Sequence, residues 1–139
     1  MTVRRILIVE DDASARECYG RLFRRHGYEV SLSPSGAWVL ANLEGLRETA
    51  VILLDYRMPG LTGLELLARM RREGIQAPVF LVSAHVTREM SDEALRLGIS
   101  RIFHKPVESA ALLQSVAEAL AHQKEEEGAA GCFAADALI

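Results

Sequence analysis

Three groups of residues in this sequence have the side-chain chemistry to hold a divalent cation and a phosphoryl group together. They are the acidic cluster Glu10-Asp11-Asp12, the single carboxylate of Asp55, and a set made of the Ser83 hydroxyl, the Ala84 backbone N–H and the Lys105 ammonium. Carboxylate oxygens suit a hard cation such as Mg²⁺. Hydroxyl, N–H and ammonium groups stabilise the negative charge of a phosphoryl group. The sequence therefore indicates phosphoryl-transfer chemistry.

Asp55 is the candidate nucleophile, because a carboxylate can attack phosphorus and form an acyl phosphate. Asp11 and Asp55 would supply two metal ligands, and Glu10 would bind the metal through water. The alternative is that the acidic cluster only caps the following helix, since acids favour a helix N-terminus. We expect that role for Asp12, but it would not explain Asp55 and Lys105.

Each of these polar groups follows an apolar run of the kind that forms a buried strand. The runs are residues 6–9, 51–54, 79–82 and 102–103. In an open parallel α/β sheet, the carboxyl ends of the strands meet at one edge, where sites form. We therefore expect the three groups to lie together.

Strand-like and helix-like segments alternate along the chain. The expected strands are residues 4–10, 29–33, 50–55, 78–83 and 100–104, and the expected helices are residues 13–26, 35–43, 63–73, 87–97 and 107–124. The central strands are apolar throughout, which is typical of a parallel sheet covered on both faces. This order predicts an α/β fold with a doubly wound, five-stranded parallel sheet, right-handed crossovers and three layers, helix–sheet–helix.

Local signals define the ends of several expected helices. Ser14-x-x-Glu17 and Thr62-x-x-Glu65 have the pattern of a capping box. Gly27 and Gly98 suit the position just past a helix end. The glycines within residues 128–131 are expected to break the last helix, so residues 123–139 are interpreted as a tail or the start of a linker after a domain of residues 1–122. The apolar segment 132–139 could instead pack on a partner.

The composition excludes some classes of function. The chain has 139 residues and a formal net charge of -3, which argues against nucleic-acid binding by bulk electrostatics. No apolar stretch approaches the roughly 18 residues of a membrane span, and the N-terminus has no signal-peptide pattern. We therefore expect no contact with a membrane. Cys18 and Cys132 lack metal-ligand spacing, so we expect a cytoplasmic protein whose cysteines are reduced.

The chain resembles the receiver domain of bacterial two-component response regulators, which has a flavodoxin-like, CheY-like (βα)5 fold. The resemblance covers about residues 3–121. It is carried by Ile6-Leu-Ile-Val-Glu-Asp-Asp12, Leu54-Asp-Tyr-Arg-Met-Pro-Gly60 with Gly63-Leu-Glu-Leu66, Val82-Ser-Ala84 and Lys105-Pro106.

This resemblance implies a role for each matching residue. Asp55 would be the phosphoacceptor, Ser83 would follow the phosphoryl group, and Lys105 would pair with it. The implied Mg²⁺ ligands are Asp11, Asp55 and the backbone carbonyl of Arg57, with Glu10 helping indirectly. The Lys105-Pro106 bond is expected to be cis. Arg57 and His85 flank the site and would tune the lifetime of the phosphoryl group.

The resemblance also implies partners. A histidine kinase or phosphotransfer protein would donate the phosphoryl group, and a downstream protein or fused output domain would read it. A homodimer through the face formed by residues 87–97, 100–104 and 107–124 is possible. The chain would be a signalling domain rather than an enzyme, with slow self-dephosphorylation.

Two residues depart from the family pattern. Ile102 occupies the position of a common aromatic switch residue, and Phe103 should point to the other face of the sheet. Output would then depend more on backbone shifts between residues 87 and 104. Val107 replaces a common Phe, which affects packing after Lys105-Pro106 rather than the chemistry.

Three other functions remain as alternatives. A pseudo-receiver would bind a partner without phosphorylation. A phosphatase of the haloacid dehalogenase type would need an acid at the position of Arg57, and a nucleotide-binding domain would need a glycine-rich phosphate loop, which the sequence lacks.

The remaining residues with notable side chains are expected to have structural roles or none. Trp38 is expected to pack, Cys18 to be half-buried, and Arg71-Arg72 to be solvated; the histidines lack metal-ligand spacing.

Overall fold

The computed structural model describes residues 3–129, and the side chains of residues 3–122. The strands are β1 (Arg5–Val9), β2 (Glu29–Ser33), β3 (Val51–Asp55), β4 (Val79–Ser83) and β5 (Arg101–His104). The helices are α1 (Ala13–Arg25), α2 (Gly36–Ala41), the short 3-10 helix η1 (Leu43–Leu46), α3 (Gly63–Arg72), α4 (Arg88–Arg96) and α5 (Ser109–Ala129). Every predicted strand and helix is therefore present.

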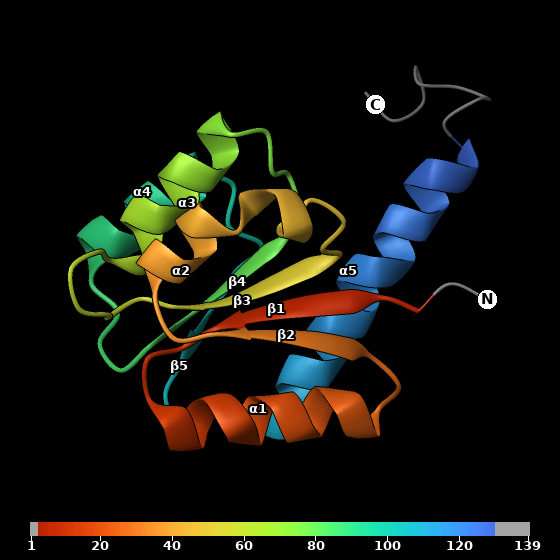
Figure 1. The fold of residues 1–139 in the computed structure, drawn as a ribbon, viewed down its shortest axis with the longest axis horizontal. Coiled ribbons are helices and arrows are strands. Elements are labelled where there is room, and N and C mark those ends of the chain that lie inside the picture. Colours follow the sequence, from red (N-terminus) through yellow and green to blue (C-terminus); the bar gives the residue numbers. More distant parts are fainter. Residues whose placement is uncertain (1–2, 130–139) are drawn as a thin grey trace.

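The five strands form one parallel sheet in the order β2-β1-β3-β4-β5. Helices α1 and α5 cover one face, and α2, α3 and α4 cover the other (Figure 1). This confirms the predicted doubly wound, three-layer α/β fold. Since all the strands run the same way, their carboxyl ends lie along one edge.

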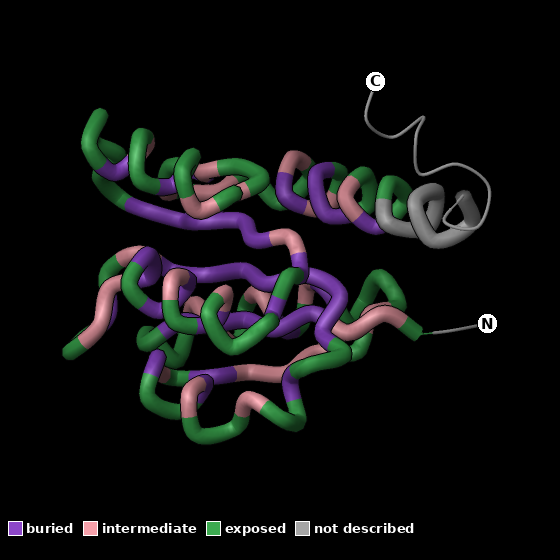
Figure 2. Tube along the Cα trace, turned by 90° about the horizontal axis from the view of Figure 1, so that it is seen from above, coloured by how far each residue is buried: buried purple, intermediate pink, exposed green. Residues whose placement is uncertain are grey.

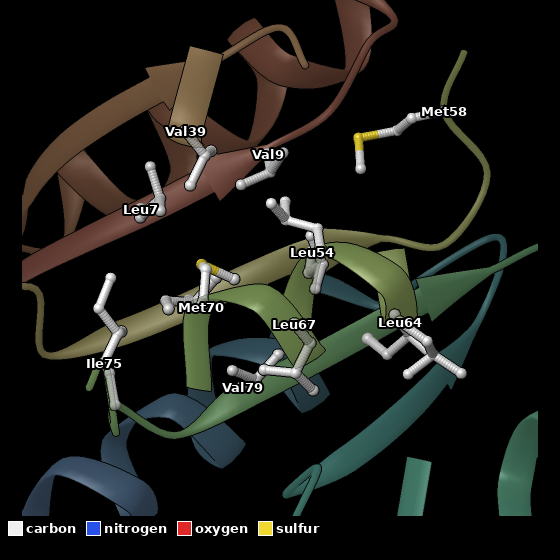
Figure 3. Close-up of a cluster of buried hydrophobic side chains, with 14 of the residues drawn as sticks. Leu7, Val9, Val39, Leu54, Met58, Leu64, Leu67, Met70, Ile75 and Val79 are labelled. Atoms are coloured by element: carbon white, nitrogen blue, oxygen red, sulfur yellow. The ribbon is translucent and has the colours of Figure 1, made fainter. Parts of the chain in front are cut away.

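The core has two halves, one on each face of the sheet, because successive strand residues point to opposite faces. Figure 3 shows the half beneath α2 and α3, where Leu7 of β1 and Leu54 of β3 pack against Leu67 and Met70. On the other face, Phe23 of α1 and Leu112, Val116 and Leu120 of α5 pack on the alternate strand residues. Strands β1, β3 and β4 are almost completely buried, whereas β2 and β5 at the two edges of the sheet are partly exposed (Figure 2). Burial on both faces explains why the sequences of the three central strands are continuously apolar.

The helix ends confirm one predicted capping box and correct the other. Thr62 and Glu65 form the predicted reciprocal box at α3. At α1 the N-cap is Asp12, whose side chain accepts from the Ala15 N–H, so the box predicted at Ser14 is wrong. Strand β1 ends at Val9, which places Asp12 rather than Ser14 at the first free N–H groups of the helix.

Two helix boundaries differ from the prediction. Helix α2 ends at Ala41 and is followed by η1. Helix α5 begins at Ser109 and extends to Ala129, past the expected break at Gly128. One glycine costs a helix only about 1 kcal/mol relative to alanine, and the Glu and Ala residues around it favour helix. The whole apolar segment 132–139, including Cys132, lies outside the described residues.

Two surface predictions are also corrected. Cys18 is exposed rather than half-buried. Trp38 is 37% exposed, so most of its surface is covered, in line with the expected packing role. Arg71 is not simply solvated, because its Nη1 donates to the carbonyls of Ile75 (3.0 Å) and Ala77 (2.9 Å). Among the described residues, no helix has the length and apolar character needed to cross a membrane.

Candidate functional site

Three carboxylates converge at the carboxyl edge of the sheet. Strands β1 and β3 are neighbours, with Val9 paired to Leu54, so the residues that follow them lie side by side. Glu10, Asp11 and Asp55 can each place one oxygen within 4.8 Å of the others. Glu10 and Asp55 are 2% and 6% exposed, whereas Asp11 is open to solvent. An all-oxygen donor set with one open side suits a hard cation that keeps some of its water.

Lys105 brings a positive charge to this cluster. Its Nζ lies 3.2 Å from Asp55 Oδ1 and 3.3 Å from Glu10 Oε1. The Lys105 backbone N–H donates to the Ser83 carbonyl at 2.9 Å, which holds the chain after β5 against the end of β4. The Lys105-Pro106 peptide bond is cis, as predicted. The bond to Ser83 thus holds Lys105 at the end of β4, and from there its ammonium reaches the carboxylates.

The electrostatics of the cluster are unbalanced without a metal. Burial raises the pKa of Glu10 from 4.5 to about 7, with further increases from hydrogen bonding to and repulsion by Asp55. The Asp12 N–H and Lys105 act in the opposite direction. Burial would lower the pKa of Lys105, but attraction to Asp55 and Glu10 raises it above its ordinary value. One ammonium therefore does not fully compensate the carboxylates, and an added cation would.

The three acidic residues in the turn between β1 and α1 have two different roles. The Glu10 N–H donates to the Ser33 carbonyl at 3.0 Å, and Glu10 Oε2 accepts from the Asp12 N–H at 3.2 Å. Asp12 Oδ2 accepts from the Ala15 N–H at 2.8 Å, which is its capping bond. Glu10 and Asp11 thus belong to the cluster, and Asp12 caps α1 as predicted.

Gly63 holds the loop that follows Asp55. Its N–H donates to the Tyr56 carbonyl at 2.7 Å, so the start of α3 packs directly on the end of β3. A Cβ at this position would lie 2.5 Å from the Asp55 carbonyl oxygen. Sequence reasoning did not assign this role, although a glycine immediately after the Thr62 cap was a local signal for close backbone approach.

Ser83, Ala84 and Arg57 lie at the same edge but are not hydrogen-bonded to the carboxylates. The Ser83 hydroxyl donates to the His85 carbonyl (2.7 Å) and accepts from the His85 N–H (3.2 Å). Ala84 follows it and is exposed, and Arg57 is exposed in the loop after β3. Sequence reasoning also missed Arg16, whose Nη1 donates to the carbonyls of Glu10 and Asp11.

A groove opens beside Lys105, with a volume of about 780 Å³. It lies between α1 and the segment from Lys105 to α5, and its walls include Tyr19, Leu22 and Val107. Burial raises the pKa of the Tyr19 hydroxyl above its ordinary value. The groove thus opens at the edge of the site, next to Lys105.

The chain is similar to known proteins in sequence and in fold. Residues 6–117 match the family model described as the response regulator receiver domain. The transcriptional regulatory protein FixJ of Bradyrhizobium diazoefficiens is 32% identical over 115 residues, covering 83% of this chain and 56% of FixJ. Regulator of RpoS from Escherichia coli is 38% identical over 106 residues, covering 75% of this chain and 31% of that protein.

Solved structures agree with the sequence comparisons. A CheY-like response regulator receiver domain from Methanospirillum hungatei superposes with a TM-score of 0.84 at 28% identity, covering 90% of this chain and 99% of that one. The chain spans about half or less of the length of the curated relatives named above.

Proposed function

We infer the function of this chain from its family: it belongs to the response regulator receiver domains of two-component systems, and we propose that Asp55 accepts a phosphoryl group. The observation that carries the proposal is the pairing of a nearly buried carboxylate with a fixed ammonium, 3.2 Å apart, inside an acidic cluster. A carboxylate nucleophile needs such a cation to offset the charge that it gains.

In the proposed transfer, an oxygen of Asp55 attacks the phosphorus of the donor. The bond between phosphorus and the donor breaks, its electron pair leaves with the donor, and an aspartyl phosphate forms. Lys105 pairs with the new phosphoryl charge. The Ser83 hydroxyl and the Ala84 N–H bind phosphoryl oxygens, which requires the Ser83 hydroxyl to give up its donor bond to the His85 carbonyl.

The residues proposed to hold Mg²⁺ are Asp11, Asp55 and the backbone carbonyl of Arg57, with Glu10 acting indirectly. Support comes from the donor set, because three carboxylates within 4.8 Å of one another repel unless a cation offsets them. When bound, the ion would supply positive charge next to the phosphoryl oxygens. Lys105 would supply the charge on the other side.

The proposed partners follow from this role. A histidine kinase or phosphotransfer protein donates the phosphoryl group, and the groove beside Lys105 leaves room for it. A downstream protein or a fused output domain reads the result through α4, β5 and α5, where a homodimer could also form. We propose a cytoplasmic signalling domain of residues 1–122, with residues 123–139 as a tail or the start of a linker. It would act neither as an enzyme in its own right nor through direct contact with nucleic acid or a membrane.

Intact-mass measurement tests the assignment. The wild-type chain is incubated with acetyl phosphate, with and without Mg²⁺, beside Asp55→Asn and Asp92→Asn. Asp92 is exposed on α4, so its variant makes the same chemical change far from the cluster. We expect one adduct of about 80 Da with Mg²⁺ in wild type and Asp92→Asn, and none in Asp55→Asn.

Labelling of Asp55→Asn at the wild-type level would place the acceptor elsewhere. If wild type takes up no phosphoryl group and binds no beryllofluoride, the chain is a pseudo-receiver. If the chain is labelled at a single site but Asp11→Ala binds Mg²⁺ as the wild type does, Asp55 remains the proposed acceptor. Asp11 would then not be a ligand of the metal.

A further inference from the structure

Arg16 reaches back from α1 to the turn that carries two of the clustered acids. Its Nη1 donates to the Glu10 carbonyl at 2.9 Å and to the Asp11 carbonyl at 3.3 Å. Side chains on a helix tilt toward its N-terminus, so a long residue near the start of α1 extends over the preceding turn. The guanidinium therefore clamps two consecutive peptide units of that turn.

These two carbonyls lie beyond the end of β1 and are not part of its hydrogen-bond ladder with the neighbouring strands. Strand β1 ends at Val9, which pairs with Ser33 and Leu54, and the last backbone bond of this edge runs from the Glu10 N–H to the Ser33 carbonyl. Beyond that point the chain must turn into α1 while it carries two carboxylates toward Asp55. Repulsion between these like charges favours opening the turn.

Arg16 is poorly suited to stabilising α1 itself. A cation near a helix N-terminus opposes the helix dipole, at a typical cost of about 0.3–1 kcal/mol. The capping bond of α1 is already made by Asp12. The contacts of Arg16 lie in the turn, so its benefit is in the geometry of the turn.

The chemistry of the contacts also matters. Arg16 is hydrogen-bonded to backbone carbonyls, so its bonds use no oxygen of the Glu10 or Asp11 carboxylate. An ion pair with either carboxylate would compete with a metal for the same oxygen. Binding the carbonyls holds the turn in place and keeps the ligand oxygens available.

We propose that Arg16 is a positioning residue for the metal site, which fixes the Glu10–Asp11 turn so that both carboxylates converge on Asp55. This inference rests on the proposed function, because it presupposes that the cluster binds Mg²⁺. Removing a residue that orients metal ligands typically weakens affinity by about 10- to 100-fold. Since Arg16 acts through the backbone, we expect about tenfold.

The direction in which the Mg²⁺ affinity changes distinguishes the loss of positioning from the loss of positive charge. Removing a nearby positive charge would by itself tighten Mg²⁺ binding, since like charges repel. Weaker binding in Arg16→Met therefore reports loss of the clamp. Arg24→Met is the matched control, because Arg24 lies exposed in the last turn of the same helix and its loss makes the same change in net charge.

Isothermal titration calorimetry of the full chain with magnesium chloride measures the affinities. Arg16→Met should raise the Mg²⁺ dissociation constant about tenfold, and Arg24→Met should leave it at the wild-type value or lower. Arg16→Lys keeps the charge on a shorter stem, so we expect a smaller loss. It is the variant to use if circular dichroism shows Arg16→Met to be unfolded.

Binding by Arg16→Met as tight as or tighter than wild type would overturn the proposal, as would an equal loss in Arg24→Met. If Arg16→Lys is the variant used, unchanged affinity overturns it. A wild-type chain that shows no Mg²⁺ binding would contradict the proposed metal site itself and the inference with it.

Discussion

The ammonium of Lys105 lies 3.2 Å from Oδ1 of Asp55, although β5, which precedes Lys105, and β3, which ends at Asp55, are separated by β4. This contact fixes a positive charge where phosphorylation would add negative charge. Lys105→Met should therefore slow labelling of Asp55 by acetyl phosphate by about 100-fold. Arg72→Met, an exposed change on α3, should label at the wild-type rate. Equal rates in the two variants would show that Lys105 does not stabilise the transfer.

Glu10 should make the metal-free protein less stable as the pH rises. Its pKa is about 7 in the fold against 4.5 ordinarily, chiefly because it is buried and next to Asp55. Between these values the folded chain binds more protons than the unfolded chain, so this stabilisation is complete below pH 4.5 and is lost as the pH rises through about 7.

Urea unfolding at pH 5.5 and 8.5, in the presence of a chelator, measures this effect. The Glu10 contribution to the free energy of unfolding should fall by about 2 kcal/mol between these two pH values. Glu10→Gln should remove that dependence, and Glu48→Gln, at an exposed position, should retain it. A Glu10→Gln profile parallel to wild type would show that Glu10 titrates normally.

Ser83 should exchange partners when the site is occupied. Its hydroxyl now makes two hydrogen bonds with the backbone of His85, and the proposed transfer state needs it on a phosphoryl oxygen. Beryllofluoride, added with Mg²⁺, should therefore shift the His85 amide resonance in a ¹H–¹⁵N spectrum. An unmoved His85 amide beside shifted Asp55 and Tyr56 amides would mean that Ser83 keeps its present bonds.

Gly63→Ala should destabilise the fold and disturb Asp55. The added Cβ would lie 2.5 Å from the Asp55 carbonyl oxygen and 3.1 Å from Tyr56 Cα, both of which are backbone atoms. Overpacking of this kind costs about 1–3 kcal/mol. Gly45→Ala is the control, because a Cβ there meets nothing within 4 Å. Thermal unfolding compares the two, and equal midpoints would contradict the close packing.

Asp12 and Asp11 should respond differently to substitution by alanine. Asp12→Ala removes the N-cap of α1 and should cost about 1 kcal/mol of stability with little change in Mg²⁺ affinity. Asp11→Ala should weaken Mg²⁺ binding with a smaller effect on stability. Ser14→Ala should change neither, since Ser14 does not cap the helix. Calorimetric titration measures the Mg²⁺ affinity of each variant, and thermal unfolding measures its stability. If Asp12→Ala instead lost Mg²⁺ affinity and Asp11→Ala lost stability, Asp12 would be the metal ligand and Asp11 the cap.

The sequence determined the architecture because its signals are local or topological. Continuous apolar runs predict strands buried on both faces, and alternation with helices requires them to be parallel. Once the strands are parallel, polar residues at their carboxyl ends must share one edge. The convergence of Glu10, Asp55 and Lys105 could therefore be predicted without knowing any distance.

Where several residues suit the same local role, the tertiary structure decided which of them has it. Asp12 and Ser14 both fit a helix cap, and the end of β1 selects Asp12. The exposure of Cys18 depends on the rotation of α1 about its axis, which the packing of Phe23 against the sheet sets.

Long side chains and buried charges depend most on the fold. Arg16 and Arg71 both bind backbone carbonyls that become available only where strands end and turns form. The raised pKa of Glu10 requires both burial and the nearby Asp55. A sequence specifies the type and order of such groups, but their partners and their solvation arise only when the chain has packed, because both depend on distances between residues that are far apart along it.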